Sequence, residues 1–163
     1  MTRYLFRICL LLTLGFAASQ TMLSAQERSR MDGTWSLSVT VVNCQTGAPI
    51  RTVASLQQYR PDGSLTETAN TASRGISEGV WGFASDDTVA SAYWFYRYNP
   101  DGTFHSRASA TNKITLGEPG HFTAVGMVRD YDANGNLIST GCVTQTGTRL
   151  AADLGPSGDE RDR

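Results

Sequence analysis

One seven-residue phrase, YRPDGSL at residues 59–65, recurs with substitutions as YNPDGTF at 98–104 and YDANGNL at 131–137. Proline suits the first corner of a type I turn, because its ring fixes φ at about −65°. Asp or Asn at the second corner can hydrogen-bond back to the backbone, and the following glycine tolerates the left-handed conformation of a G1 bulge. Each copy therefore predicts a β-hairpin, in which the tyrosine pairs across strands with the final Leu or Phe.

The segments between these turns have the pattern of β-strands. In GTWSLSVTVV (33–42), apolar side chains alternate with serine and threonine, which indicates one buried and one exposed face. Seven further strands are expected at 50–59, 64–71, 80–84, 88–98, 103–116, 121–131 and 137–150. We predict an all-β fold, an eight-stranded antiparallel up-and-down barrel that leaves no exposed edge. A two-sheet β-sandwich is the alternative.

The N-terminus has the features of an export signal. Two arginines within residues 3–7 precede the apolar run ICLLLTLGFAA, which is short for a membrane span but suits the core of a signal peptide. We expect residues 1–25 to be removed by cleavage after Ala25, or after Ser19 as a second choice. The mature product is then periplasmic or secreted, with an N-terminal arm at 26–32, a barrel domain at 33–150 and a disordered polar tail at 151–163.

Several function classes are disfavoured by composition and motifs. The formal net charge is −1 and the charges are scattered, so no basic surface for nucleic acid is expected. No stretch after the signal is apolar enough to span a membrane. His105 and His121 are far apart and lack companion ligands, so we predict neither a metal site nor a cofactor. We find no nucleophile elbow and no phosphate-binding glycine loop, and we predict that the protein is not an enzyme.

Two cysteines, Cys44 and Cys142, remain after the signal is removed. In an oxidising compartment they most simply form one disulfide, and two free buried thiols are the alternative. If these cysteines lie directly opposite each other on the first and last strands, Leu37 faces Arg149 and Trp35 becomes a diagonal neighbour of Arg149. Odd-numbered residues of both strands would then point into the barrel.

A second register comes from the third copy of the repeated phrase. Pairing of Tyr131 with Leu137 places Val125 and Met127 on the same inward face. A β-bulge could slip either of these two registers by one residue, which would reverse the assignment of the inward face.

The start of the first strand, Gly33-Thr34-Trp35, resembles the Gly-x-Trp signature of lipocalins and the wider calycin group. In that family an arginine or lysine near the end of the last strand packs across the tryptophan at the closed end of the barrel. The resemblance implies that Arg149 has this role over Trp35, in a cation–π contact. It implies a lipocalin-like bacterial secreted protein.

The best candidate for a ligand pocket is the aromatic run YWFYRY at 93–98. The interior of an eight-stranded barrel is either filled by side chains or holds one small ligand, and aromatic side chains suit its lining. Pairing of Tyr98 with Phe104 places Trp94 and Tyr96 on the inward face, although a filled core or an aromatic outer face is the alternative. Trp81 is expected in the core. The predicted ligand-binding residues are Trp94, Tyr96, Tyr98, Phe104, Val125, Met127 and Tyr131.

Two functions follow from this interpretation. The first is an exported barrel that binds a small, largely apolar molecule in its interior. The alternative is a protein-binding barrel that acts through its rim or N-terminal arm, similar to bacterial inhibitors of secreted proteases. An isomerase or cyclase that acts on a lipid is a third possibility, and no residue in the sequence supports it. The longest rim loop, ASRGISEG at 72–79, is expected to be a lid, a partner contact or a plain solvent loop.

Overall fold

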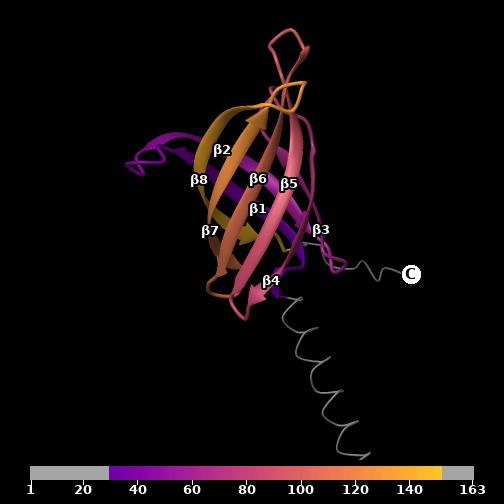
Figure 1. Ribbon diagram of the computed structural model, residues 1–163. Coiled ribbons are helices and arrows are strands. Elements are labelled where there is room, and N and C mark those ends of the chain that lie inside the picture. The colour runs from indigo at the N-terminus through magenta and orange to yellow at the C-terminus, as the bar shows by residue number, and fades with distance from the viewer. Residues whose placement is uncertain (1–29, 152–163) are drawn as a thin grey trace, which may run out of the picture.

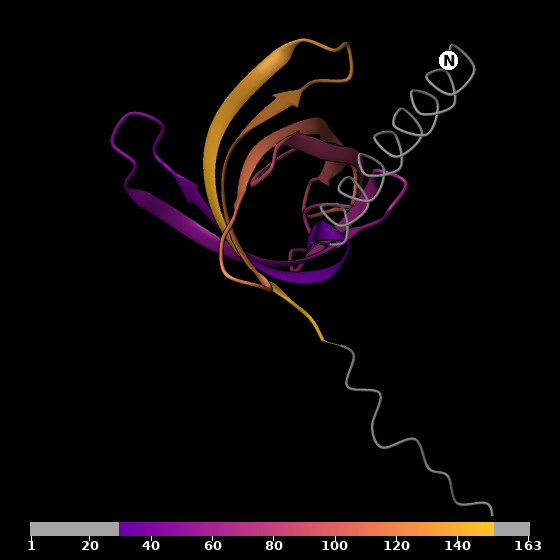
Figure 2. The same cartoon turned by 90° about the horizontal axis from the view of Figure 1, so that it is seen from below.

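The structure, a computed structural model, describes residues 30–151 as a closed barrel of eight antiparallel strands (Figure 1). The strands are β1 (Gly33–Val42), β2 (Pro49–Tyr59), β3 (Ser64–Ala69), β4 (Ser77–Ser85), β5 (Thr88–Tyr98), β6 (Phe104–Leu116), β7 (His121–Tyr131) and β8 (Leu137–Arg149). Each strand pairs with its neighbours in the chain, and β1 also pairs with β8, which completes the ring in Figure 2. The predicted barrel is confirmed and the sandwich is excluded. The predicted signal peptide, arm residues 26–29 and tail residues 152–163 lie outside the described part of the chain.

All three copies of the repeated phrase form the predicted turn. Their glycines have positive φ values of 85°, 82° and 84° at Gly63, Gly102 and Gly135. In each turn the carboxylate of one aspartate accepts a hydrogen bond from the backbone N–H of the residue two positions later, and these aspartates are Asp62, Asp101 and Asp132. In each case hydrogen bonds, chiefly from a nearby side chain, lower the pKa of that carboxyl.

Two of these hairpins contain a β-bulge next to the turn. Tyr98 pairs with Phe104 as predicted, but Arg97 then pairs with Ser106. Likewise Tyr131 pairs with Leu137, and the next pair is Asp130 with Ser139. The extra residue on β6 and on β8 slips the pairing register by one, so each preceding residue of β5 and β7 lies opposite a residue of the other face from the one expected.

The closed end of the barrel (bottom of Figure 1) is filled by side chains. Arg149 lies directly opposite Trp35, and its guanidinium carbon is 4.9 Å from the indole centroid, which confirms the predicted contact. The Trp35 indole N–H donates to the carbonyl of Met31 at 2.9 Å, and Met31 is fully buried. Phe122 packs against Trp35 with a centroid distance of 4.9 Å. Arg30 and Met31 therefore cover this end of the barrel.

The disulfide between Cys44 and Cys142 is present, with a Cα–Cα distance of 5.2 Å. Its predicted register was wrong by two residues, because Cys142 lies opposite Val42 and Cys44 follows the end of β1. A shift of two keeps each side chain on its face, so Trp35 and Leu37 are buried as expected. Within residues 30–151, no helix has the length and apolarity needed to cross a membrane.

Candidate functional site

The barrel interior contains a small cavity at the end opposite Trp35, which we call the open-end cavity. Its volume is about 60 Å³. Its apolar wall consists of Phe95 and of inward valines from four strands, Val39, Val41, Val53, Val128 and Val143. Its polar lining includes Arg51, Ser55, Glu67, Arg74, Tyr93 and Arg97. The cavity is thus an apolar chamber with charged groups inside it.

A buried ion pair between Glu67 and Arg74 dominates the polar side of the cavity. The Glu67 side chain is 1% exposed and the Arg74 side chain 12% exposed. One oxygen of Glu67, Oε2, accepts bonds from the Arg74 guanidinium and the Ser77 hydroxyl, and Arg74 also donates to Ser77 at 2.7 Å. Burial lowers the pKa of Arg74, an effect that the Glu67 charge opposes. The arginine remains charged because its ordinary pKa is so high.

Arg74 reaches the interior because the rim loop between β3 and β4 folds back onto β5. The Gly75 N–H donates to the Tyr96 carbonyl at 2.9 Å, and the Tyr98 N–H donates to the Ser73 carbonyl at 2.8 Å. The Arg74 guanidinium then stacks over the Phe95 ring, 3.6 Å from its centroid. The loop expected to be a lid, a partner contact or a solvent loop therefore contributes part of the cavity lining.

Two further arginines line the mouth of the cavity. Arg97 donates to Asp130 at 2.6 Å, and its guanidinium carbon is 5.0 Å from the Phe95 centroid. Arg51 is exposed at the rim, and no carboxylate among residues 30–151 forms a salt bridge with it. The lining carries three guanidinium groups, two of which are neutralised by Glu67 and Asp130.

Three residues that line the cavity have buried polar atoms without a hydrogen-bond partner in the described chain. These atoms are Ser55 Oγ, Glu67 Oε1 and Arg74 Nε. A buried polar atom that lacks a partner costs about 1–3 kcal/mol, so most proteins avoid it. Three residues that line one cavity therefore carry polar atoms with which a bound polar group could pair.

A layer of buried polar side chains adjoins the cavity through Tyr93, which is also part of the cavity lining. We call it the polar layer, and it consists of Gln57, Tyr59, Tyr93, Asn112 and Gln145. The Tyr59 hydroxyl donates to Gln57, and the Gln145 amide donates to Asn112 at 3.0 Å. Burial raises the pKa of Tyr93 to about 12 and that of Tyr59 well above its ordinary value. Both hydroxyls therefore stay protonated at neutral pH.

The predicted ligand-binding residues do not line this cavity. The inward direction predicted for Trp94, Tyr96 and Val125 was wrong, because these side chains are 45%, 54% and 59% exposed on the outer face. The bulges beside Tyr98 and Tyr131 explain the reversal, since they place Tyr93, Phe95 and Val128 inside instead. The other predicted residues, Tyr98, Phe104, Met127 and Tyr131, are also absent from the cavity lining. The aromatic outer face was the correct alternative for Trp94, Tyr96 and Phe104.

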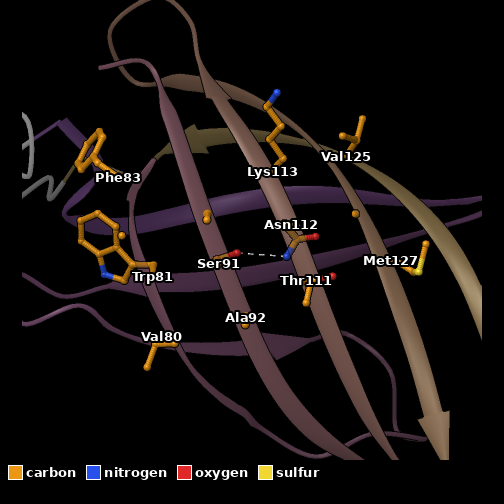
Figure 3. A pocket seen from close by; sticks show the side chains of 13 residues that line it. Val80, Trp81, Phe83, Ser91, Ala92, Thr111, Asn112, Lys113, Val125 and Met127 are labelled. Carbon is orange, nitrogen blue, oxygen red and sulfur yellow. Dashed lines mark hydrogen bonds between the residues drawn. The ribbon is translucent and has the colours of Figure 1, made fainter. Parts of the chain in front are cut away.

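Part of this outer face forms a shallow groove of about 800 Å³ across β4, β5, β6 and β7 (Figure 3). The groove exists because Gly82, Ala90 and Ala92 on its floor carry little or no side chain. The exposed Val80 and Val125 lie along it. Val125 and Met127 therefore line an external groove, not the interior.

The two histidines lie at opposite ends of the barrel. His105 is at the start of β6 beside the open end, and His121 is at the start of β7 near the closed end. His105 hydrogen-bonds to Ser106 at 2.9 Å, and His121 contacts Thr148 at 3.4 Å. Within the described ranges of the chain, no group of three or more His, Cys, Asp or Glu side chains is placed to hold a metal ion.

One of the missed site residues left a signal in the sequence. Leu65 was expected to pair with Tyr59 across the first hairpin, and Glu67 is two positions along the same strand face. A glutamate on the face of a buried leucine is a strong indication of a site, because charged side chains are seldom buried without a role. Arg74 left no such signal, since it lies in an irregular loop whose path depends on the folded barrel.

Fold and cavity together define a closed β-barrel with a small chamber at one end, whose lining is part apolar and part charged. No protein family and no curated protein matches the sequence. Among solved structures, the S-type phycobiliprotein lyase CPES from Guillardia theta is similar to this chain, with a TM-score of 0.42 and 14% sequence identity. The alignment covers 78% of this chain and 92% of the lyase chain.

Proposed function

We propose that this protein is an exported, lipocalin-like barrel that binds a small molecule in the open-end cavity. An apolar part of the molecule would pack against Phe95 and the valines, and a polar end would face Glu67 and Arg74. The observation that carries the proposal is the set of three buried polar atoms without partners on residues that line this cavity. A bound polar group would remove the cost of leaving them unpaired.

The buried ion pair supports the same proposal. Desolvation of two charges often exceeds their attraction, so a buried pair is a poor way to gain stability. The Glu67–Arg74 pair is nevertheless placed at the cavity, where it can orient a ligand. A binding role gives this arrangement a physical reason that stability alone does not.

The size of the cavity limits the ligand. Sites for drug-sized molecules usually have volumes of about 300–1,000 Å³, whereas the open-end cavity has about 60 Å³. The ligand is therefore a small molecule, or a larger one of which only a short end enters. Each Å² of apolar ligand surface that is buried contributes about 25 cal/mol before ordering costs.

Export is supported by the disulfide and by the signal-like N-terminus. Disulfides persist in oxidising compartments and are rare in reducing ones. The bond between Cys44 and Cys142 links the segment just after the end of β1 to β8. The charged and apolar segments at residues 3–18 have the order found in signal peptides.

The geometry favours the cavity over an N-terminal arm as the binding region. The described residues of that arm, 30–32, are held against the closed end of the barrel. Met31 is fully buried, and Arg30 forms an ion pair with Asp87 at 2.8 Å. Binding of a protein through the rim remains an outcome that the following experiment can reveal.

Native mass spectrometry of the protein purified from its own host tests the proposal. We expect a retained small molecule, seen as a mass above that of the chain and lost on denaturation. Ala69 lines the cavity and Ala90 lies on the outer groove, so Ala69→Phe should abolish the extra mass while Ala90→Phe preserves it. A retained protein, or an extra mass that survives Ala69→Phe but not Ala90→Phe, would contradict the proposal.

A further inference from the structure

We propose that the group bound beside Glu67 and Arg74 is electrically neutral and carries both a hydrogen-bond donor and an acceptor, as an alcohol or a primary amide does. This inference rests on the proposed function, because it specifies the chemistry of the ligand in the same cavity. It narrows the largely apolar ligand expected from the sequence to a short amphipathic one.

The unpaired atoms define the hydrogen-bonding pattern of the ligand. Arg74 Nε can only donate, and Glu67 Oε1 can only accept while its carboxyl is ionised. Ser55 Oγ can do either. A single group that accepts from Arg74 and donates to Glu67 would satisfy both, and hydroxyl and carboxamide groups have this capacity. A ketone or ether could satisfy only Arg74.

The charges at the same place disfavour an ionic ligand. The Glu67 and Arg74 charges compensate each other, and their side chains are 1% and 12% exposed. A carboxylate seated here would meet the Glu67 carboxylate, and an ammonium would meet the Arg74 guanidinium. Repulsion between like charges is strong where little water screens it, and each ion would also lose its hydration.

The other two arginines do not turn the chamber into an anion site. Arg97 is neutralised by Asp130 at 2.6 Å. Arg51 is exposed at the rim, where water and salt screen its charge. They can attract a molecule toward the mouth, but the buried end of the chamber is governed by Glu67 and Arg74.

Four probes of equal chain length test the inference: butan-1-ol, butanamide, butanoate and butan-1-amine. Each is titrated into the ¹⁵N-labelled mature protein at pH 7 and followed by NMR, including the arginine Nε–H signals. The Arg74 signal is identified by its loss in Arg74→Lys. We expect the alcohol and the amide to bind at least tenfold more tightly than both ions and to shift the Arg74 signal. The signal of Arg129 should not move, because Arg129 follows the cavity-lining Val128 on β7 and so lies on the outer face of that strand.

A pair of serine variants adds a control. Ser55 lines the cavity, whereas Ser109 lies on the outer side of β6. Ser55→Ala should weaken binding of the alcohol and the amide severalfold, and Ser109→Ala should not.

The outcomes separate the inference from the proposed function. If butanoate or butan-1-amine binds the cavity as tightly as the neutral probes, or if Ser55→Ala and Ser109→Ala behave alike, the inference is wrong while the proposed function stands. If no probe shifts any cavity residue and native mass spectrometry finds no retained molecule, both are wrong.

Discussion

Breaking the ion pair between Glu67 and Arg74 should destabilise the barrel strongly, whereas removing both charges should not. The Glu67→Gln change leaves the Arg74 guanidinium, which is 12% exposed, without its counter-charge. The Arg74→Met change leaves the Glu67 carboxylate, which is 1% exposed, in the same position. Loss of one partner from a buried pair costs about 3–5 kcal/mol, and we expect each single variant to lose about that free energy of unfolding.

The double variant distinguishes a functional pair from a structural one. Replacing both charged partners of a buried pair by uncharged side chains is often neutral or stabilising. We therefore expect Glu67→Gln/Arg74→Met to lie within about 1 kcal/mol of the natural protein, far from the sum of the single effects. The double variant should fold and yet fail to retain the ligand.

Urea unfolding followed by tryptophan fluorescence measures these energies, because Trp35 and Trp81 are buried in the barrel core. The ligand must be removed first, since binding to the native state raises apparent stability. Single variants that each lose less than about 1 kcal/mol, with additive effects in the double variant, would show that the two charges are not buried together as described.

Three further predictions concern the frame of the barrel. The disulfide joins two cysteines that are 98 residues apart in the sequence, so its reduction should lower the free energy of unfolding by up to about 4.7 kcal/mol. Urea titrations with and without reductant measure this loss, and an unchanged unfolding midpoint would contradict the prediction. Arg149→Ala removes the contact with Trp35 and should cost about 1–3 kcal/mol in thermal unfolding without affecting ligand binding, whereas Arg107→Ala on the outer face should cost less. The contribution of Tyr93 to stability should be constant up to about pH 10 and fall between pH 10 and about 12, because the unfolded chain loses the Tyr93 proton before the folded barrel does; urea titrations across this pH range measure it. Tyr93→Phe should reduce this alkaline slope, and an equal slope in that variant would argue against the burial of Tyr93.

Turn chemistry explains why the strands were predictable. Proline, Asp and glycine at fixed positions specify where each hairpin reverses, and all eight strands lie within a few residues of their predicted ranges. Closure of the barrel followed from the two cysteines and from the Trp35–Arg149 pair, because these residues lie in or beside the first and last strands. The turns are local features, and the residues that close the barrel can be recognised by their type near the two ends of the domain.

Which side chains of β5 and β7 point into the barrel could not be predicted in the same way. Both faces of β5 carry aromatic residues, since Tyr93 and Phe95 point inward while Trp94 and Tyr96 point outward. Alternation of polar and apolar residues therefore gives no preference there, and one bulged residue at His105 decides the outcome. Bulges depend on how neighbouring strands twist around the barrel, which is a property of the whole fold.

The candidate site was only partly accessible to sequence reasoning. Glu67 shares a strand face with the buried Leu65, so its unusual position could have been recognised. Arg74 comes from a loop, and Arg97 faces inward only because of the β5–β6 bulge. Residues brought together by long-range contacts have no common spacing in the chain, so the folded barrel was needed to find them.

A high-resolution crystal structure of the protein, purified without denaturation from its own host, tests the binding role of the cavity most directly. We predict density for a non-protein group that places a donor atom about 2.7–3.2 Å from Glu67 Oε1 and an acceptor atom at a similar distance from Arg74 Nε, the two being one oxygen in an alcohol and two atoms in an amide. Density for ordered water alone at these atoms, or a chamber closed by rearranged side chains that pair with one another, would contradict it.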